Sequence, residues 1–148
     1  GVHLLDARVF MDQDLAEQGL LIKGKEKIEP DHLAHGIEIA RENARLDVGQ
    51  GVVVSQGTVH AVEAFEGANA MLERAGKFGA KNCRFVKLGK PSQDTRFDVP
   101  VFGSKTLQTM RDGGVRNAAL EIGSVLVLNK PESIIEAKKL GIGLTGFR

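Results

Sequence analysis

The sequence predicts an α/β fold: a single domain with a mixed sheet, built from two helix-hairpin-helix-strand units, with helices packed on it. The length of 148 residues fits one domain better than two. A hydrophobic content of 42% is sufficient for a core. Runs of β-branched residues alternate with segments of helical periodicity, as in α/β proteins. Two pairs of strand-like runs are joined by short turns, which a purely parallel sheet lacks.

The first 30 residues are predicted to be an N-terminal extension, ahead of a domain at 31–148. Residues 4–22 are rich in apolar side chains and predict one short element. The charged run KGKEKIEPD that follows predicts a solvated linker. Because the chain begins with Gly1 in place of an initiator Met, we expect either a processing or tag remnant or a piece of a longer protein.

The first unit begins with a helix at 31–46. Asp31 follows a proline and is suited to cap this helix, and apolar residues recur on one face at helical spacing. A hairpin comes next, because valine-rich runs at 52–54 and 59–62 flank a turn in which Gly57 can adopt positive φ. The unit is completed by a helix over 67–76 and a strand over 83–88.

The second unit repeats this order. We predict a helix over 104–112 capped by Ser104, and then a hairpin in which Val115–Glu121 pairs with Ser124–Leu128 through an Ile-Gly turn. The two hairpin sequences align at an offset of 66 residues, from Val52 to Ala118, with an identity so thin that convergence explains it as well as duplication does. The last elements are a helix from Pro131 to Gly141 and a strand over 142–147.

Composition narrows the class of function. Twenty Lys and Arg against 19 Asp and Glu give a net charge of +1, and aromatic residues make up 5%, with no Trp or Tyr. Both features argue against a nucleic-acid partner, which calls for a basic surface or stacking side chains. The single cysteine, Cys83, excludes an internal disulfide and indicates a core thiol in a reduced cytoplasmic setting. No apolar stretch approaches the roughly 20 residues that cross a bilayer, so we expect no transmembrane segment.

The passage KPSQDTRFDVPVFG at 90–103 concentrates charged and polar side chains between two prolines. Prolines disfavour helix and favour extended backbone. In an extended segment, alternation places Asp94, Arg96 and Asp98 on one face, with Phe97 buried behind them. Carboxylates beside cationic side chains suit phosphate chemistry with Mg²⁺ or Mn²⁺. The alternative is an exposed loop whose charges pair with one another, and the spacing does not decide between the two.

Two further acids, Glu63 and Glu66, follow the first hairpin and precede a predicted helix start, where an anion can bind. Acidic residues also stabilise a helix start by themselves, so a structural role is the simpler interpretation. The four histidines form no metal-binding pattern, and we expect His60 to be partly buried with a hydrogen-bond partner. The sequence contains no Gly-rich phosphate loop.

Three strings in the sequence stand out together. They are LDVGQGVVVSQGTVHAVEAFEGANAMLERAG, KPSQDTRFDVPVFGSKT and the tail from ALEIGSVLVLNK to LGIGLTGF. In this order they resemble the LpxI-type UDP-2,3-diacylglucosamine pyrophosphatase family of bacterial lipid A biosynthesis, over about residues 31–146. Asn69 departs from the family pattern, which has Asp at this position. Because family members also carry an N-terminal Rossmann-like domain, residues 31–148 correspond to the C-terminal domain.

The resemblance implies hydrolysis of the pyrophosphate of UDP-2,3-diacylglucosamine to UMP and 2,3-diacylglucosamine 1-phosphate, with Mg²⁺ or Mn²⁺ as cofactor. Asp94 and Asp98 would hold the metal and orient the attacking water, in roles that the sequence does not divide between them. Arg96 would stabilise charge on the phosphoryl oxygens. The other matching positions would be substrate-binding residues, namely Lys90, Gln93, Glu63 and Glu66.

The resemblance also implies partners and a location. The partners would be the amphiphilic UDP-sugar lipid, the missing N-terminal domain and further copies in a homo-oligomer. The location would be the cytoplasm, at the periphery of the inner membrane. With one of two domains missing, we expect the isolated chain to be weakly active or inactive. The competing hypothesis is a non-catalytic module that binds a phosphosugar or nucleotide, or that dimerises. An RNA-binding fragment is disfavoured by the near-neutral charge and scarce aromatic residues.

Overall fold

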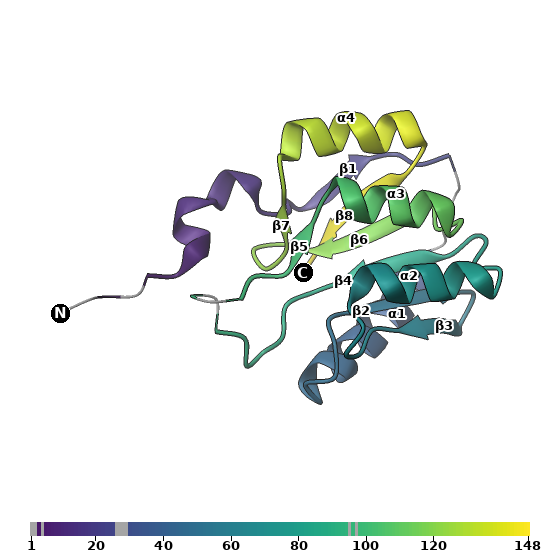
Figure 1. Ribbon diagram of the computed structural model, residues 1–148, viewed down its shortest axis with the longest axis horizontal. Coiled ribbons are helices and arrows are strands. Elements are labelled where there is room, and N and C mark those ends of the chain that lie inside the picture. Colours follow the sequence, from purple (N-terminus) through teal and green to yellow (C-terminus); the bar gives the residue numbers. More distant parts are fainter. Residues whose placement is uncertain (1–2, 4, 26–29, 95, 97) are drawn as a thin grey trace.

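The computed structural model describes residues 3, 5–25, 30–94, 96 and 98–148. Within this part of the chain it shows a single α/β domain, with a mixed sheet and four α-helices packed on it (Figure 1). The predicted fold class is therefore confirmed. None of the helices that the structure describes is long and apolar enough to span a bilayer.

The described residues form a main sheet, a small sheet and helices on both faces of the main sheet. The main sheet contains β1 (Gly19–Ile22), β2 (Gly51–Ser55), β3 (Thr58–Val62), β4 (Arg84–Lys87), β6 (Asn117–Glu121) and β8 (Gly143–Phe147). The small sheet contains β5 (Val101–Phe102) and β7 (Leu126–Val127). The helices are α1 (Pro30–Arg45), α2 (Ala68–Lys77), α3 (Ser104–Asp112) and α4 (Lys130–Leu140), preceded by the short 3-10 helices η1 (Ala7–Phe10) and η2 (Asp12–Asp14).

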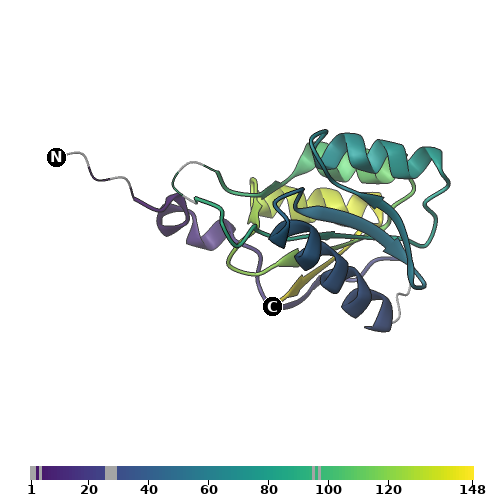
Figure 2. The same cartoon turned by 90° about the horizontal axis from the view of Figure 1, so that it is seen from below.

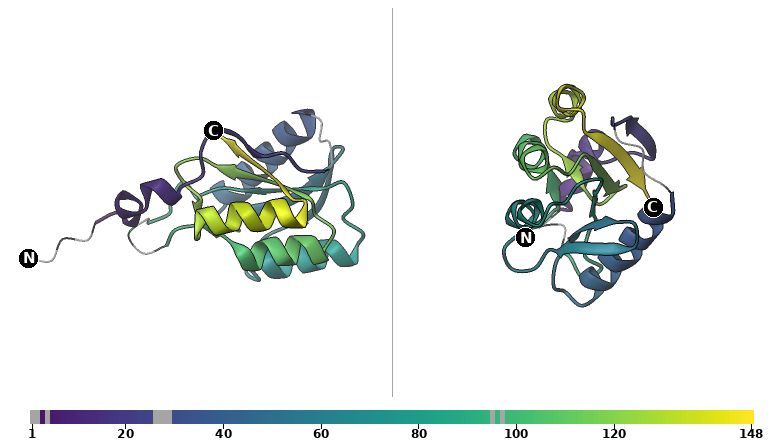
Figure 3. Two further views of the ribbon diagram at one scale, coloured as in Figure 1. Left: turned by 90° about the horizontal axis from the view of Figure 1, so that it is seen from above. Right: turned by 90° about the vertical axis from the view of Figure 1, so that its right-hand side faces the viewer.

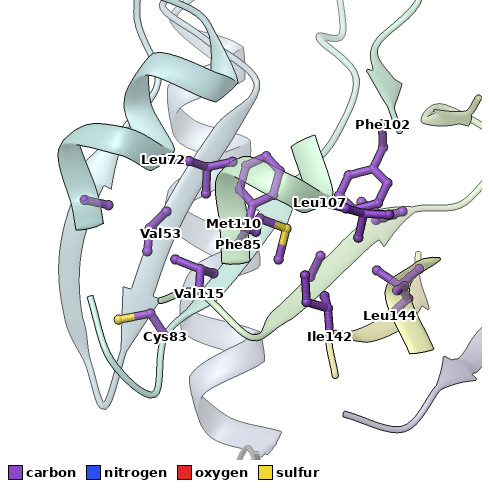
Figure 4. Close-up of a cluster of buried hydrophobic side chains, with 14 of the residues drawn as sticks. Val53, Leu72, Cys83, Phe85, Phe102, Leu107, Met110, Val115, Ile142 and Leu144 are labelled. Carbon is purple, nitrogen blue, oxygen red and sulfur yellow. The ribbon is translucent and has the colours of Figure 1, made fainter. Parts of the chain in front are cut away.

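The main sheet has the strand order β1-β8-β6-β4-β2-β3 and separates two layers of helices. α2, α3 and α4 lie side by side on one face, and α1 covers the other (Figures 1 and 3). The first face holds the larger core, which includes Phe85, Leu72 and Met110 (Figure 4). The second face holds a smaller cluster that includes Val86 and Ala40. Alternation along β4 explains this division, because Phe85 and Val86 point to opposite faces.

The first predicted hairpin is confirmed. β2 and β3 pair antiparallel, and Gln56 and Gly57 connect them with φ angles of +42° and +76°. Two consecutive positive φ angles are the requirement of a type I′ turn, and Gly57 meets it without steric cost. His60 on β3 is half-buried and shares a hydrogen bond of 2.6 Å with the Ser55 hydroxyl, as expected.

The second predicted hairpin is wrong. The chain does turn after β6, since the Val125 N–H donates to the Glu121 carbonyl over 3.1 Å. It then leaves the main sheet, and β7 pairs in parallel with β5 instead. The physical reason lies in β6, whose two edges are already occupied by β4 and β8 in parallel pairing. No edge of β6 is left for a hairpin partner, so the apparent repeat does not extend to the second hairpin.

The predicted N-terminal extension contains an unforeseen strand. Residues 19–22 form β1, which pairs antiparallel with β8 at the edge of the main sheet. η1 and η2 lie at the same end of the molecule as the loop 88–100 (Figure 2). Residues 26–29 of the predicted linker lie outside the described residues.

Two predicted helix caps are also wrong. α1 begins at Pro30, so Asp31 lies inside its first turn. Ser104 is the first residue of α3, and Gly103 precedes it without a side-chain capping bond. Both errors amount to one or two residues in the position of the cap, which is the usual uncertainty of helix ends.

Strand direction defines the edge of the sheet at which the functional residues gather. β4, β6 and β8 are parallel, and β3 runs the same way because it is antiparallel to β2, which is antiparallel to β4. The carboxyl ends of β3, β4 and β6 therefore lie at one edge, where α2, α3 and α4 begin (Figure 1). Open α/β sheets bind ligands at this edge.

Candidate active site

Three charged residues mark the carboxyl edge of the sheet. Glu63 directly follows β3, Lys87 is the last residue of β4, and Glu121 is the last residue of β6. Two loops border them: residues 46–50, between α1 and β2, and residues 88–100, between β4 and β5. The second loop carries the proline-bounded motif, so the fold brings the motif to Glu63, which the sequence had only placed near a helix start.

The motif turns instead of extending. The Asp98 N–H donates to the Asp94 carbonyl over 3.0 Å, and Asp94 Oδ1 accepts the Arg96 N–H over 3.1 Å. This side-chain bond to the backbone two residues on is a common turn device of aspartate. The prediction of an extended segment is therefore wrong, and so is the face that it assigned to the three charged residues. Phe97, whose burial was predicted, lies outside the described residues.

Asp94 and Arg96 pair with each other on the surface. Arg96 Nε donates to Asp94 Oδ1 over 2.8 Å and Nη2 donates to Oδ2 over 2.5 Å, a two-pronged contact. The hydrogen bond from Arg96 lowers the pKa of Asp94, and the same bond raises the pKa of Arg96. For these two residues the structure therefore agrees with the alternative in which the loop charges pair with one another.

Gln93 is the centre of the hydrogen bonds around the motif. Its Oε1 accepts from Gln50 Nε2 over 2.6 Å and from the Lys90 N–H over 3.1 Å. Its Nε2 donates to Asp98 Oδ2 over 2.8 Å. Since the amide uses its oxygen as acceptor and its nitrogen as donor, one orientation satisfies all three bonds. Gln93 thus holds the Asp98 carboxylate in place relative to the loop before β2.

Two further contacts tie the motif to neighbouring elements. Lys90 Nζ lies 2.9 Å from Asp47 Oδ1 in the loop after α1, and the Gly89 N–H donates to Glu121 Oε2 over 3.0 Å. Beside them lies a cavity of 210 Å³. It is lined by Arg8, Gly89, Lys90, Pro91, Gln93, Pro100, Glu121 and Ser124. The start of the motif therefore forms one wall of a hollow at the carboxyl ends of β4 and β6.

Glu63 and Lys87 are buried behind this surface. Their exposed fractions are 8% and 5%. The Glu63 backbone is fixed by an N–H bond to the Gly51 carbonyl and by Asn43 Nδ2, which donates to the Glu63 carbonyl. The Glu63 side chain is less well satisfied, because its Oε2 is buried and has no hydrogen-bond partner in the described part of the chain. Buried carboxylate oxygens without a partner are rare in proteins.

Burial acts on the charge of Lys87. It lowers the pKa of the ammonium, and the nearby carboxylates of Glu63 and Asp98 partly oppose this shift. Lysine side chains are almost never this deeply buried unless they are paired. Lys87 is thus under the electrostatic influence of the buried Glu63 and of the exposed Asp98, which is a motif residue.

Glu66 has a different environment from Glu63. It is exposed, and it forms an ion pair with Arg74 of α2, in which Arg74 Nη2 lies 2.5 Å from Glu66 Oε1. The hydrogen bond from Arg74 lowers the pKa of Glu66. The structure therefore separates the two acids that the sequence treated together: Glu66 is exposed and pairs with α2, and Glu63 is buried at the carboxyl end of β3.

Sequence reasoning did not identify Lys87, Gln50 or Glu121. Gln50 and Glu121 have no local pattern to mark them, since only the pairing of strands brings them to the motif. Lys87 did have a signal. It stands two positions after Phe85 in the string CRFVKL, so alternation assigns it to the same face of the strand as Phe85. A lysine at such a position is a reason to look for a function.

The carboxylates differ in their suitability for a metal ion. In phosphate chemistry Mg²⁺ takes one or two carboxylates, and waters and substrate oxygens complete its shell. Asp98 fits this requirement, because it is exposed and, among the described residues, only its Oδ2 accepts a hydrogen bond, from Gln93. Asp94 fits less well, because Arg96 holds both of its oxygens. Over the described residues, no group of three His, Cys, Asp or Glu side chains is arranged to hold a metal.

Comparisons with known proteins agree with the resemblance of the motifs. The family model "LpxI C-terminal domain" matches residues 17–145. The UDP-2,3-diacylglucosamine pyrophosphatase LpxI of Caulobacter vibrioides is 37% identical over 157 aligned residues. The alignment covers 99% of this chain and 55% of that protein. The chain therefore spans about half the length of this curated relative.

Proposed function

The chain belongs to the LpxI family, and from this we propose that it forms the C-terminal half of a UDP-2,3-diacylglucosamine pyrophosphatase of bacterial lipid A biosynthesis. In the proposed reaction, a water oxygen attacks one phosphorus of the pyrophosphate. The bond from that phosphorus to the bridging oxygen breaks, the water loses its proton, and UMP and 2,3-diacylglucosamine 1-phosphate form. The observation that carries the proposal is the hydrogen-bonded group of Lys90, Gln93 and Asp98 at the ligand-binding edge of the sheet.

We propose Asp98 as the ligand of a divalent metal, Mg²⁺ or Mn²⁺. When bound, such an ion polarises phosphoryl oxygens and lowers the pKa of a coordinated water. Gln93 supports this role, because its amide fixes Asp98 Oδ2 and leaves the other oxygen of the carboxylate outside any hydrogen bond between described residues. Few protein ligands are required, since waters and substrate oxygens fill most of the Mg²⁺ shell.

Asp94 and Arg96 then act as one unit. Arg96 presents a planar guanidinium to the phosphoryl oxygens, and Asp94 orients it through two hydrogen bonds. Lys90 adds positive charge at the cavity wall. This division of labour treats Asp98 as metal ligand and Asp94 as a positioning residue, which the sequence alone left open.

The other half of the relative matters for turnover. Correct positioning of reactants can supply about 7 kcal/mol or more of a reaction barrier. A chain that spans 55% of the relative would lose the contacts that the remaining part makes with the substrate. We therefore propose that this chain alone hydrolyses the substrate poorly. We place the reaction in the cytoplasm, at the periphery of the inner membrane, where an amphiphilic UDP-sugar lipid is accessible.

The test measures release of UMP from UDP-2,3-diacylglucosamine with Mn²⁺ present. Two proteins are compared: this chain alone, and this chain placed behind the N-terminal half of the Caulobacter relative. We expect strong activity only in the joined protein. If the joined protein folds and releases no UMP, the chain is a non-catalytic binding or dimerisation module.

In the joined protein, Asp98→Asn should lower hydrolysis by about two or more orders of magnitude and raise the Mn²⁺ concentration needed for half-maximal rate. Asp94→Asn should lower the rate with the Mn²⁺ requirement unchanged. Asp112→Asn, an exposed acid at the end of α3 and at the opposite edge of the sheet, is the matched control and should have no effect. Unchanged hydrolysis in both motif variants would remove the motif from the active site.

A further inference from the structure

Lys87 is a buried cation whose ammonium has no hydrogen-bond acceptor in the described part of the chain. Alternation along β4 turns it to the same side as Phe85, toward the face that α2, α3 and α4 cover. Its Nζ lies 6.0 Å from the centre of the Phe85 ring, and 5% of the residue is exposed. The position is the carboxyl end of a central strand, beside the motif loop.

Apart from the contact with the Phe85 ring, the charge of Lys87 is balanced only through space. Among the described residues, none forms a hydrogen bond or a direct ion pair with its Nζ, and Glu63 and Asp98 act on it electrostatically from farther away. An ammonium removed from water without hydrogen-bond partners destabilises the fold. A ligand that supplies the missing hydrogen-bond acceptor explains why a destabilising lysine is present at this position.

Glu63 is the second member of this arrangement. Its carboxylate, on a residue that is 8% exposed, has an oxygen without a hydrogen-bond partner in the described chain. The close approach of Glu63 to the sheet depends on Gly51, because a Cβ at this position would lie 2.7 Å from Glu63 Oε2 and 2.8 Å from the Phe85 ring. Glu63 and Lys87 thus both adjoin Gly51 of β2, because the Glu63 N–H donates to the Gly51 carbonyl and Gly51 pairs with Lys87 across β2 and β4.

We propose that Lys87 Nζ binds a non-bridging oxygen of the substrate's pyrophosphate, and that Glu63 is a positioning residue that keeps the ammonium turned toward the motif. This inference rests on the proposed function and adds a substrate-contacting residue that the motifs do not contain. The anion reaches the ammonium from the side of Asp98, the exposed one of the two carboxylates that face it. Asp98 would hold the metal, and the ammonium of Lys87 would bind a phosphate oxygen of the same substrate.

The direct test is binding of magnesium pyrophosphate to the 148-residue chain, measured by calorimetry. Lys87→Met keeps the length and apolar stem of the side chain, so the fold should survive, and a thermal melt checks this. We expect it to weaken binding by about tenfold to hundredfold, the scale of a lost charged hydrogen bond. Lys87→Arg should restore part of the affinity. Lys105→Met, an exposed lysine in the first turn of α3, is the matched control and should change affinity less than about twofold.

Side-chain NMR gives a second measurement. The ¹³Cε signal of Lys87, assigned by its loss in Lys87→Met, should shift on addition of magnesium pyrophosphate. The inference is overturned if that signal stays in place, if wild type does not bind pyrophosphate, if folded Lys87→Met binds as wild type does, or if Lys105→Met weakens binding as much.

Hydrolysis by the joined protein separates this inference from the proposed function. Loss of hydrolysis in Lys87→Met, with the Mn²⁺ requirement unchanged, supports both. Full hydrolysis in folded Lys87→Met overturns the assignment of Lys87 and leaves the function standing. Absence of UMP release from the wild-type joined protein, together with pyrophosphate binding that depends on Lys87, overturns the function and leaves Lys87 as an anion-binding residue.

Discussion

Two lysines are buried at the same edge of this domain, and their surroundings differ completely. Lys130 begins α4 and is 9% exposed, and Lys87 ends β4 and is 5% exposed. Lys130 Nζ donates to the carbonyls of Gln13 and Leu15 over 3.1 Å and 2.9 Å, and it pairs with the carboxylate of Glu17. Lys87 has no such bond within the described residues.

The difference separates structure from function. The three acceptors of Lys130 all lie in the segment just before β1, so this lysine fastens the N-terminal segment to the start of α4. A satisfied buried charge of this kind needs no ligand to explain it. Lys87 has only the Phe85 ring and the through-space effect of Glu63 and Asp98 in the described chain, so its ammonium lacks a hydrogen-bond acceptor. The comparison predicts that the two lysines respond in opposite ways to the same substitution.

The largest expected effect is on stability, in Lys130→Met. The substitution removes the donor from the buried bond to the Leu15 carbonyl and from the partly buried bond to the Gln13 carbonyl, and an unsatisfied buried group costs about 1–3 kcal/mol. We expect the free energy of unfolding to fall by roughly 3 kcal/mol in urea titrations. The N-terminal segment should also become a site of limited proteolysis. A decrease of less than about 1 kcal/mol in the free energy of unfolding would show that Lys130 does not hold the N-terminal segment against α4.

The next effect has the opposite sign. Lys87→Met replaces an ammonium without partners by an apolar side chain of similar length, and such exchanges of buried charge are often stabilising. In metal-free buffer at pH 7 we expect a gain of about 1 kcal/mol in the free energy of unfolding. A clear loss of stability in this variant would mean that Lys87 has a structural partner after all.

The pH dependence of that gain sharpens the comparison. Burial lowers the pKa of Lys87 in the folded chain below its ordinary value of 10.5. Between that lowered pKa and pH 10.5, the unfolded chain therefore binds more protons than the folded chain. Stability of the wild type relative to Lys87→Met therefore rises with pH in this window. The advantage of Lys87→Met should shrink between pH 7 and pH 10.5, as measured by paired urea titrations.

The same contrast shows how far the sequence can be interpreted on its own. Local signals were sufficient for the first hairpin, the four helices and the fold class, because turn chemistry and periodicity act over a few residues. The second hairpin failed, since the edges of β6 are occupied by strands distant in the sequence. The turn within the motif was not predicted, because the Asp94 side chain accepts a hydrogen bond from the Arg96 N–H and strand periodicity carries no information about such a bond.

The candidate site was predictable where its residues lie in one string. Lys90, Gln93 and Asp98 do gather, and the motif identified them. Lys87 and the role of Glu63 depend on the packing of β2 between β3 and β4. For Lys87 the alternation along its strand was a signal, but its charge alone does not indicate burial, and sequence reasoning did not single it out.

The smallest expected effect is that of Glu17→Gln, which removes the ionic partner of Lys130 and leaves its two carbonyl acceptors in place. The Glu17 side chain is 68% exposed, so water screens the pair. The shift in the urea midpoint at pH 7 should be at most about a third of that caused by Lys130→Met.

The pH dependence of the effect of Glu17→Gln shows that it comes from the Glu17 carboxylate. The hydrogen bond from Lys130 lowers the pKa of Glu17 below its ordinary value of 4.5, so the contribution is complete above that pH and is lost as pH falls through the lower pKa of the folded state. Wild type and Glu17→Gln should therefore converge in stability toward pH 3. If Glu17→Gln lowered stability as much as Lys130→Met does, the ion pair, and not the bonds to the two carbonyls, would hold the N-terminal segment to α4.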